Sequence, residues 1–265
     1  MNNVKKIAMV ALLLVIIGGV GSIITFNINE PIAVAEDKEV ENTNITAIDI
    51  QANNEQIEIH STNDSKASIE LTGKTKTGEE RLSVEENGNT LSIRTEEQKN
   101  KLFNFNFWTF SMKLNIYLPE KLYDSIQIDN DNGSITAENL DVTEIDAATQ
   151  NGKINLNNIT AENVQMNTNN GKISLSNVDG EIYGKTNNGA ISLITNNLDR
   201  PIEFDTDNGK IEIQSEQEPT NAILDVRVDN GRIDICGDSN WDSVIGNGEN
   251  KIKLTTNNGS ITMTK

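Results

Sequence analysis

The stretch "TNNGKISLSNV", residues 168–178, decides the fold, because near copies of it recur along the second half of the chain. Each copy holds an Asn-Gly pair, one small or basic residue, an isoleucine and, two residues later, a second apolar residue. The pairs end at Gly133, Gly152, Gly171, Gly189, Gly209, Gly231 and Gly259. Their spacings of 19, 19, 18, 20, 22 and 28 residues indicate supersecondary units that stack on one another.

Two β architectures fit an Asn-Gly pair flanked by alternating apolar residues. One is a meander of hairpins, since Asn-Gly is a strong hairpin signal. A meander, however, has no reason to keep isoleucine at one fixed offset from the turn in every copy. A parallel β-solenoid explains the offset, because each residue stacks on its equivalent in the next rung at ~4.8 Å. We therefore predict an all-β fold, a parallel β-solenoid of about 19 residues per rung with stacked Ile and Leu inside.

The turns carry further expectations. Asparagine and glycine both tolerate positive φ, so the Asn-Gly pair is expected to bend the chain in that conformation. Asparagine side chains in stacked turns are expected to bond to one another as a ladder. The longer spacings beyond Gly209 predict loops that bulge from the later rungs. One such loop holds Trp241, which either caps the open end of the core or is a contact point.

Strand patterns begin well before the repeats. "ITAIDIQANNEQIEIH" (residues 45–60) and "RLSVEENGNTLSIRT" (81–95) alternate apolar and polar residues around a turn. The predicted organisation is a cytoplasmic tail at 1–6, a membrane anchor at 7–26, a polar acidic linker at 27–44, a degenerate β-strand region with an aromatic insertion at 45–128, and solenoid repeats at 129–265.

The expected anchor is "IAMVALLLVIIGGVGSIITF", residues 7–26, an uncharged run long enough to cross ~30 Å of hydrocarbon as a helix. Lys5 and Lys6 precede it and acidic residues follow, so the positive-inside bias places the N-terminus in the cytoplasm and the rest outside. The alternative is a secreted protein whose signal peptide is cleaved after Ala35, because "AVA" at 33–35 fits a small-residue cleavage site. The length of the apolar run favours a single-pass anchor.

The composition excludes several functions. The chain has 265 residues with a formal net charge of -18, which argues against nucleic-acid binding because phosphates need a basic face. Cys236 is the single cysteine and His60 the single histidine, so neither a disulfide framework nor a clustered thiolate–imidazole metal site can form within one chain. Cys236 is expected on a strand as a small buried hydrophobe. No cofactor or bound metal is expected.

Acidic motifs point to turns rather than to chemistry. "DNDNGSITAE" (129–138) and "DTDNG" (205–209) resemble calcium loops but are one residue too short before the glycine. Aspartate and asparagine are ordinary turn residues, so the motifs are read as turns. The chain shows no cluster of acids and bases typical of a catalytic groove, and we expect a protein that is not an enzyme. A carbohydrate-active enzyme on a β-helix is the weakest alternative.

One stretch, "KLFNFNFWTF" at residues 101–110, is unusually rich in aromatics. It contains Phe103, Phe105, Phe107, Trp108 and Phe110. These side chains either form a local core that closes the N-terminal end of the solenoid or contact the membrane interface or a protein partner, where exposed aromatic clusters are enriched.

The order of these features resembles the bacterial "putative adhesin" β-strand-repeat family of unknown function. The likeness covers about residues 45–265 and includes "LNIYLPEKLYDSIQID" (114–129) before the repeated "NGKI-x-L". Within that family the chain is most similar to the LiaG-like membrane-anchored proteins of Gram-positive cell-envelope stress operons. The resemblance implies an extracytoplasmic β-solenoid without known catalytic residues. We expect a non-enzymatic binding module of the cell envelope whose partner is a wall polymer, a lipid or a membrane protein.

Overall fold

The computed structural model describes residues 11–12, 14–16, 32–75, 80–97, 112–237 and 243–265. Of the expected anchor at 7–26, only residues 11–12 and 14–16 are described, and they are helical. Within the described parts of the chain, no helix has the length and apolar character needed to cross a membrane. All other regular structure in the described residues is β, and hydrogen bonds join their nineteen strands into one wound sheet.

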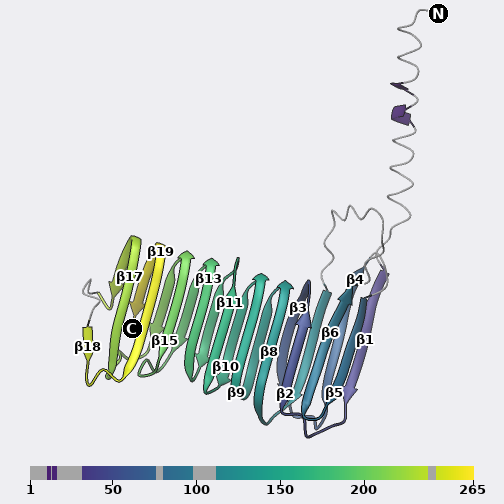
Figure 1. Ribbon diagram of the computed structural model, residues 1–265, viewed down its shortest axis with the longest axis horizontal. Coiled ribbons are helices and arrows are strands. Elements are labelled where there is room, and N and C mark those ends of the chain that lie inside the picture. The colour runs from purple at the N-terminus through teal and green to yellow at the C-terminus, as the bar shows by residue number, and fades with distance from the viewer. Residues whose placement is uncertain (1–10, 13, 17–31, 76–79, 98–111, 238–242) are drawn as a thin grey trace, which may run out of the picture.

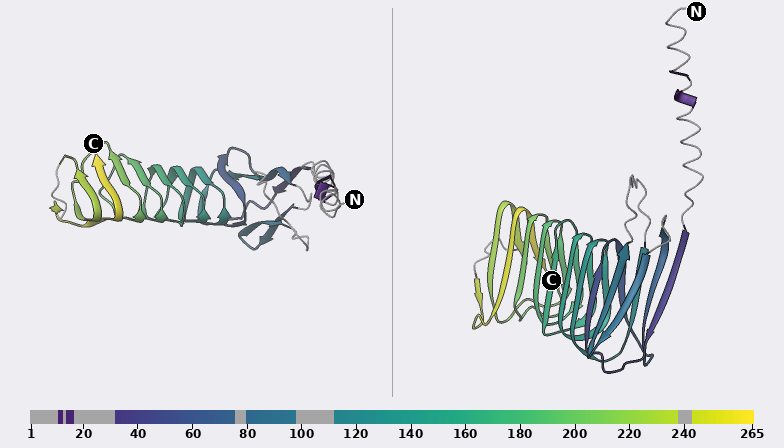
Figure 2. Two further views of the ribbon diagram at one scale, coloured as in Figure 1. Left: turned by 90° about the horizontal axis from the view of Figure 1, so that it is seen from above. Right: turned by 45° about the vertical axis from the view of Figure 1, so that its right-hand side comes forward.

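The wound sheet has two layers, which we call A and B, with the core between them (Figures 1 and 2). In spatial order, layer A contains β5 (Glu80–Asn87), β6 (Thr90–Glu97), β2 (Ala47–Ala52), β8 (Leu122–Asn132), the second half of β9 (Ile135–Asn151), β11 (Asn163–Thr168), β13 (Glu181–Asn188), β15 (Ile202–Asn208), the first halves of β19 (Asn250–Thr264) and β17 (Ala222–Ile235), and β18 (Ser243–Ile245).

Layer B runs beside it in the same direction. It contains β1 (Ile32–Val40), β4 (Ala67–Thr75), β7 (Met112–Pro119), β3 (Glu55–Thr62), the first half of β9, β10 (Ile154–Thr160), β12 (Ile173–Val178), β14 (Ile191–Thr195), β16 (Ile211–Ser215), and the second halves of β19 and β17. A rung therefore consists of one A strand followed, after the turn, by one B strand, as in β2–β3 and β15–β16.

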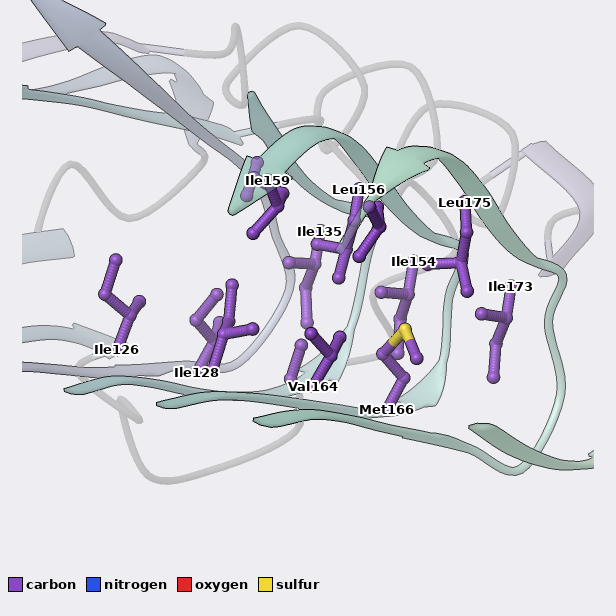
Figure 3. Close-up of a cluster of buried hydrophobic side chains, with 14 of the residues drawn as sticks. Ile126, Ile128, Ile135, Ile154, Leu156, Ile159, Val164, Met166, Ile173 and Leu175 are labelled. Carbon is purple, nitrogen blue, oxygen red and sulfur yellow. The ribbon is translucent and has the colours of Figure 1, made fainter. Parts of the chain in front are cut away.

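The middle rungs confirm the predicted parallel β-solenoid. Ile154 pairs in register with Ile135 on one side and Ile173 on the other, and Ile191 continues the same stack. The side chains from the two layers meet in a continuous aliphatic core, which Figure 3 shows around Ile154. Alternation along each strand puts every second side chain into this core, as in β13 with its repeating buried positions.

The ends of the stack do not follow the order of the chain. The first rung, β2–β3, lies inside the stack, with β6 and β7 on its outer side and β8 and β9 on its inner side. The last rung, β19, likewise lies between β15–β16 and β17 (Figure 1). The long spacings after Gly209 reflect both the exchange of the last two repeats and a long connection from Ile235 to Asn250, which holds β18.

The expected reason for the repeated glycine was wrong. Of the glycines in the seven repeats, Gly133 alone has a positive φ, at 142°. At Gly171, a Cβ atom would overlap the carbonyl oxygen of Gly152 in the neighbouring rung, and Gly152 meets Gly133 in the same way. Glycine recurs because adjacent backbones approach each other closely at this turn. Positive φ occurs instead inside the layer B segments of β9, β10 and β12, in Asn139, Asn158 and Asn177.

The predicted asparagine ladder is present and follows the spatial order of the rungs. Nδ2 of each asparagine donates to Oδ1 of the one before it, at distances from 2.8 to 3.2 Å. In order, the ladder is Asn54, Asn132, Asn151, Asn170, Asn188, Asn208, Asn258 and Asn230. Asn258 precedes Asn230 in space, which is an independent sign of the exchanged repeats.

Two local predictions were wrong. Part of the expected linker at 27–44 is strand β1, which pairs antiparallel with β4 and packs Val34 and Val40 against the core. Its pairing partners lie 27 (Val40 to Ala67) to 43 (Ile32 to Thr75) positions away in sequence, so the local pattern gave little sign of the pairing. Cys236 is exposed rather than buried, because β17 ends at Ile235 and Cys236 turns away with a φ of 52°.

Candidate functional site

The outward side of layer A from β8 to β17, which we call the A face, is a regular grid of polar side chains. The parallel register places Gln165 between Asp146 and Tyr183, and Tyr183 beside Glu203. Lys253 then follows Glu203 in the same row. Because rungs repeat every ~4.8 Å, these side chains form a row along the solenoid axis.

The row borders a hollow of about 260 Å³, which we call the Tyr183 trough. It crosses the strands from β9 to β19 and reaches down to core side chains such as Val164 and Ile182. Its rim carries polar and ring-bearing residues, namely Glu144, Asn163, Gln165, Glu181, Tyr183, Pro201, Glu203, Lys251 and Lys253. The trough therefore offers an apolar floor beneath a polar rim, which is the usual composition of ligand sites.

The core beneath Tyr183 has an unusual packing arrangement. Gly184 points inward in a position that other rungs fill with larger side chains, such as Met166 on β11. The ring of Phe204 on the adjacent strand occupies that space, and a Cβ on Gly184 would lie 3.1 Å from its Cδ1 atom. Phe204 is fully buried and packs against Gly184, the residue next to Tyr183.

The two halves of the trough differ in how their side chains are paired. On the β19 side, Lys253 Nζ lies 2.7 Å from Glu203 Oε1, and Lys251 Nζ lies 3.4 Å from Asp225 Oδ2. The hydrogen bond from Lys253 to Glu203 raises the pKa of Lys253. On the β11–β13 side, Gln165 and Tyr183 make no side-chain hydrogen bond to any residue that the structure describes. The unpaired half is thus the half available to a ligand.

A second hollow of about 160 Å³ lies on the same face over Ala148. Ala148 occupies an outward position between Asp129 and Asn167, and its small side chain leaves the space open. Asn169 and Lys185 are also on its rim. Beside it, burial, followed by repulsion from Glu144 and Asp129, raises the pKa of Asp146.

The outward side of layer B carries a different cluster, centred on His60. Its Nε2 atom lies 3.4 Å from Glu58 Oε2 and its Nδ1 atom 3.6 Å from Glu138 Oε2. Lys113 Nζ is 2.9 Å from Glu58, and the His60 ring stacks on Tyr117 with centroids 5.9 Å apart. Lys113, with His60 as a further donor, keeps the pKa of Glu58 low despite its partial burial. These contacts tie the inserted strand β3 to its neighbours β7 and β9.

The residues singled out from the sequence have little overlap with the A face. Phe103, Phe105, Phe107, Trp108 and Phe110 lie outside the described residues, as does Trp241. The calcium-like motifs contribute Asp129 to the Ala148 hollow and Asp205 to an ion pair with Lys185 at 3.1 Å. Among the described residues, no group of three or more His, Cys, Asp or Glu side chains is placed to hold a metal ion.

Tyr183 and Gln165 were not predicted as site residues. The sequence gave little indication of them, because the residues at outward-facing positions differ from one repeat to the next. Tyr183 is nevertheless the single aromatic residue among the outward positions from β9 to β16, whose other members are polar, charged or aliphatic. That contrast can be read once the register of the repeat is known.

The geometry of the stack agrees with the family assignment. The sequence pattern of the Toastrack DUF4097 family matches residues 45–184 and 166–264, which together span the solenoid from β2 into β19. The chain belongs to the Toastrack DUF4097 family. The Toastrack family membership confirms the resemblance drawn from the "NGKI-x-L" repeats.

Solved structures with a similar course of the chain have low sequence identity. A "putative adhesin" from Bacteroides fragilis is 14% identical, with an alignment covering 89% of this chain and 98% of its own and a TM-score of 0.48. A "putative cell adhesion protein" from Clostridium sporogenes is 13% identical, covering 89% and 99%, with a TM-score of 0.39. A "putative lipid binding protein" from Parabacteroides distasonis is 16% identical, covering 87% and 97%, with a TM-score of 0.27. No curated protein matches this Toastrack chain.

Proposed function

We propose that this Toastrack protein is a non-enzymatic binding module of the cell envelope, held at the membrane by residues 7–26 with its solenoid outside. The observation that carries the proposal is the A face, a regular polar surface with two hollows on a rigid stack of rungs. Repeat proteins of this kind present extended surfaces to large ligands. The likeness to LiaG-like proteins supports a place in the Gram-positive envelope and a link to envelope stress.

Two observations support a retained anchor over secretion. The uncharged run at 7–26 is long enough to cross a bilayer, and Lys5 and Lys6 precede it. The competing cleavage site after Ala35 falls inside β1, where Ala35 pairs with Thr72 of β4. Cleavage there would remove the first part of a strand that pairs with β4 from Ile32 to Val40.

The anchor is tested by fractionating cells that express the native chain and sequencing its N-terminus. A membrane-bound protein that begins at or near Met1 supports the tether. A released protein that begins at Glu36 would replace the tethered module with a secreted adhesin.

Binding is tested with the full chain in lipid nanodiscs, mixed with isolated cell-wall fragments and with membrane vesicles from the same cells. We expect the protein to co-sediment with one of these fractions, whereas empty nanodiscs do not. If neither fraction retains the protein, and crosslinking in cells yields no envelope partner, the binding function is excluded.

A further inference from the structure

The Tyr183 trough differs from the rest of the molecule in its charge. The chain as a whole has a formal net charge of -18. The trough rim, by contrast, carries the carboxylates of Glu144, Glu181 and Glu203 against the ammonium groups of Lys251 and Lys253. The rim of the Ala148 hollow carries one acid, Asp129, and one base, Lys185. The lysines are already paired, Lys251 with Asp225, Lys253 with Glu203 and Lys185 with Asp205, so each hollow keeps only a small excess of acid. Such a site suits an uncharged ligand better than a polyanion or a polycation.

The groups left unpaired in the trough are those that bind hydroxyl groups. The Gln165 amide offers two donors and an acceptor, and the Glu181 carboxylate offers two acceptor oxygens. The Tyr183 ring, partly exposed beside them, offers an apolar surface with a polar tip. A ring that has an apolar C–H face and hydroxyl groups around its edge matches this combination, and a sugar residue is such a ring.

The shape of the site indicates a chain rather than a single sugar. The Tyr183 trough is open along its length and runs across successive strands. The Ala148 hollow lies beside it on the same face, and Asn167 on its rim is two residues from Gln165 on the trough rim. Two neighbouring open hollows of similar chemistry are arranged as subsites for a polymer, whereas a single small molecule would be enclosed more fully.

We propose that the A face binds an uncharged glycan chain, with one sugar ring on Tyr183, hydroxyl groups on Gln165 and Glu181, and the chain continuing into the Ala148 hollow. This inference rests on the proposed function and gives its ligand class and its site. Tyr183 supplies the contact surface, and Gln165 and Glu181 set the orientation of the sugar ring.

The test uses the full chain in nanodiscs and measures the binding of defined hexamers by calorimetry. The probes are N-acetylglucosamine hexamer and cellohexaose as uncharged glycans, hexagalacturonate as a polyanion and hexalysine as a polycation. We expect at least one uncharged hexamer to bind, with hexagalacturonate and hexalysine at least tenfold weaker. Tighter binding of either charged probe would overturn the assignment of ligand class.

Variants then locate the site. Tyr183→Ala is expected to weaken glycan binding at least tenfold, while Tyr183→Phe, which keeps the ring and the fold, changes it less than threefold. Gln165→Ala is expected to weaken binding about threefold to tenfold. The matched control is Gln214→Ala, because Gln214 is an exposed outward glutamine on the B layer. Equal losses for the Phe and Ala variants, or a loss in the control, would overturn the proposed site.

The outcomes separate this inference from the proposed function. If wall fragments retain the protein but no uncharged hexamer binds, the glycan inference fails and the envelope module stands. If wall fragments retain Tyr183→Ala and wild type equally, the trough is not the site. If no envelope fraction retains the protein, the proposed function itself fails.

Discussion

The middle rungs and the two ends of this solenoid are built by different rules. From β9 to β16, the order in the chain is the order in space, and partners in the asparagine ladder are 18 to 20 residues apart. At the ends, β2–β3 and β19 are inserted, and the ladder joins residues 78 and 50 positions apart. Sequence repetition therefore specifies the register of the middle, whereas long-range pairing specifies the ends.

The two ends also close differently. At the N-terminal end, antiparallel strands β1, β4 and β5 replace the parallel rungs, and β1 carries four consecutive charged residues from Glu36 to Glu39. At the C-terminal end, the outermost long strand in space is β17, which is parallel to its neighbour β19. The short strand β18 covers only Ala222–Leu224 of β17. Antiparallel, charged edge strands oppose further strand addition, so the N-terminal end is the better protected of the two.

The largest effect is expected from removing an inserted rung. Ending the chain at Glu249 deletes β19, which buries Ile252, Leu254 and Ile261 between β15–β16 and β17. The loss approaches the whole stability of a typical domain, ~5–15 kcal/mol, so the urea transition followed by circular dichroism should lose its cooperativity. Ending the chain at Met263 is the control and should leave the midpoint unchanged. A cooperative transition without β19 would mean that the inserted rung is dispensable.

A glycine of the middle can be compared with one of the N-terminal end. Gly171→Ala places a Cβ on the carbonyl of Gly152, and neither backbone can move without breaking the ladder, so we expect a loss of at least ~4 kcal/mol. Gly88, in the β5–β6 hairpin, has a φ of 67° and open space around it. Gly88→Ala should therefore cost only the ~1–2 kcal/mol of the left-handed conformation. Chemical denaturation measures both, and equal losses would contradict the close-approach explanation.

Leucine truncation compares the two regions again. Leu193 on β14 has rungs on both sides, and Leu193→Ala is expected to cost ~3–5 kcal/mol. Leu82 on the edge strand β5 is also buried but pairs with β6 alone. Leu82→Ala should leave a smaller cavity because the edge can collapse, with a loss of ~2 kcal/mol. The free energies of unfolding are compared from the denaturant midpoints of variants that keep the wild-type m-value. A larger loss of stability for Leu82→Ala than for Leu193→Ala would contradict this prediction.

The smallest effect is expected in the asparagine ladder. Asn170→Ala removes two bonds, one donated to Asn151 at 2.8 Å and one accepted from Asn188 at 2.9 Å, for a loss of ~1–2 kcal/mol. Asn230, at the end of the ladder, donates a single bond to Asn258. Asn230→Ala should cost about half as much, ~0.5–1 kcal/mol. The melting temperatures of the two variants are compared with that of the wild type. Equal decreases would show that the ladder bonds contribute little to stability.

The sequence predicted the features that depend on repetition. The isoleucine stack through Ile154 and the asparagine ladder through Asn170 follow from a fixed period, because parallel register brings equivalent residues together. The reason for the glycine could not be read from the sequence, since the close approach at Gly171 involves the backbone of another rung. A recurring glycine in a sequence can reflect a need for positive φ or a need for the smallest side chain, and the sequence does not distinguish the two.

The features that the sequence did not predict depend on contacts between distant segments. The exchange of β17 and β19 leaves only irregular spacings in the sequence, which loops explain equally well. Strand β1 has a charged run from Glu36 to Glu39, and its pairing with the distant strand β4 stabilises it. The Tyr183 trough arises from outward residues on several rungs, so it appears only when the rungs are aligned.

The inserted rungs also determine the order in which the molecule forms. Neighbours about 19 residues apart close short loops, so the rungs between β9 and β16 are the part of the chain that assembles fastest. The inserted strands β2–β3 and β19 contact neighbours far away in sequence, with ladder partners 78 and 50 residues apart. Such long-range contacts form later. Until β19 enters its slot, β17 has no parallel neighbour, and the C-terminal end stays open to pairing with other chains. The last rung therefore acts as the closing step of folding, after which the stack is complete.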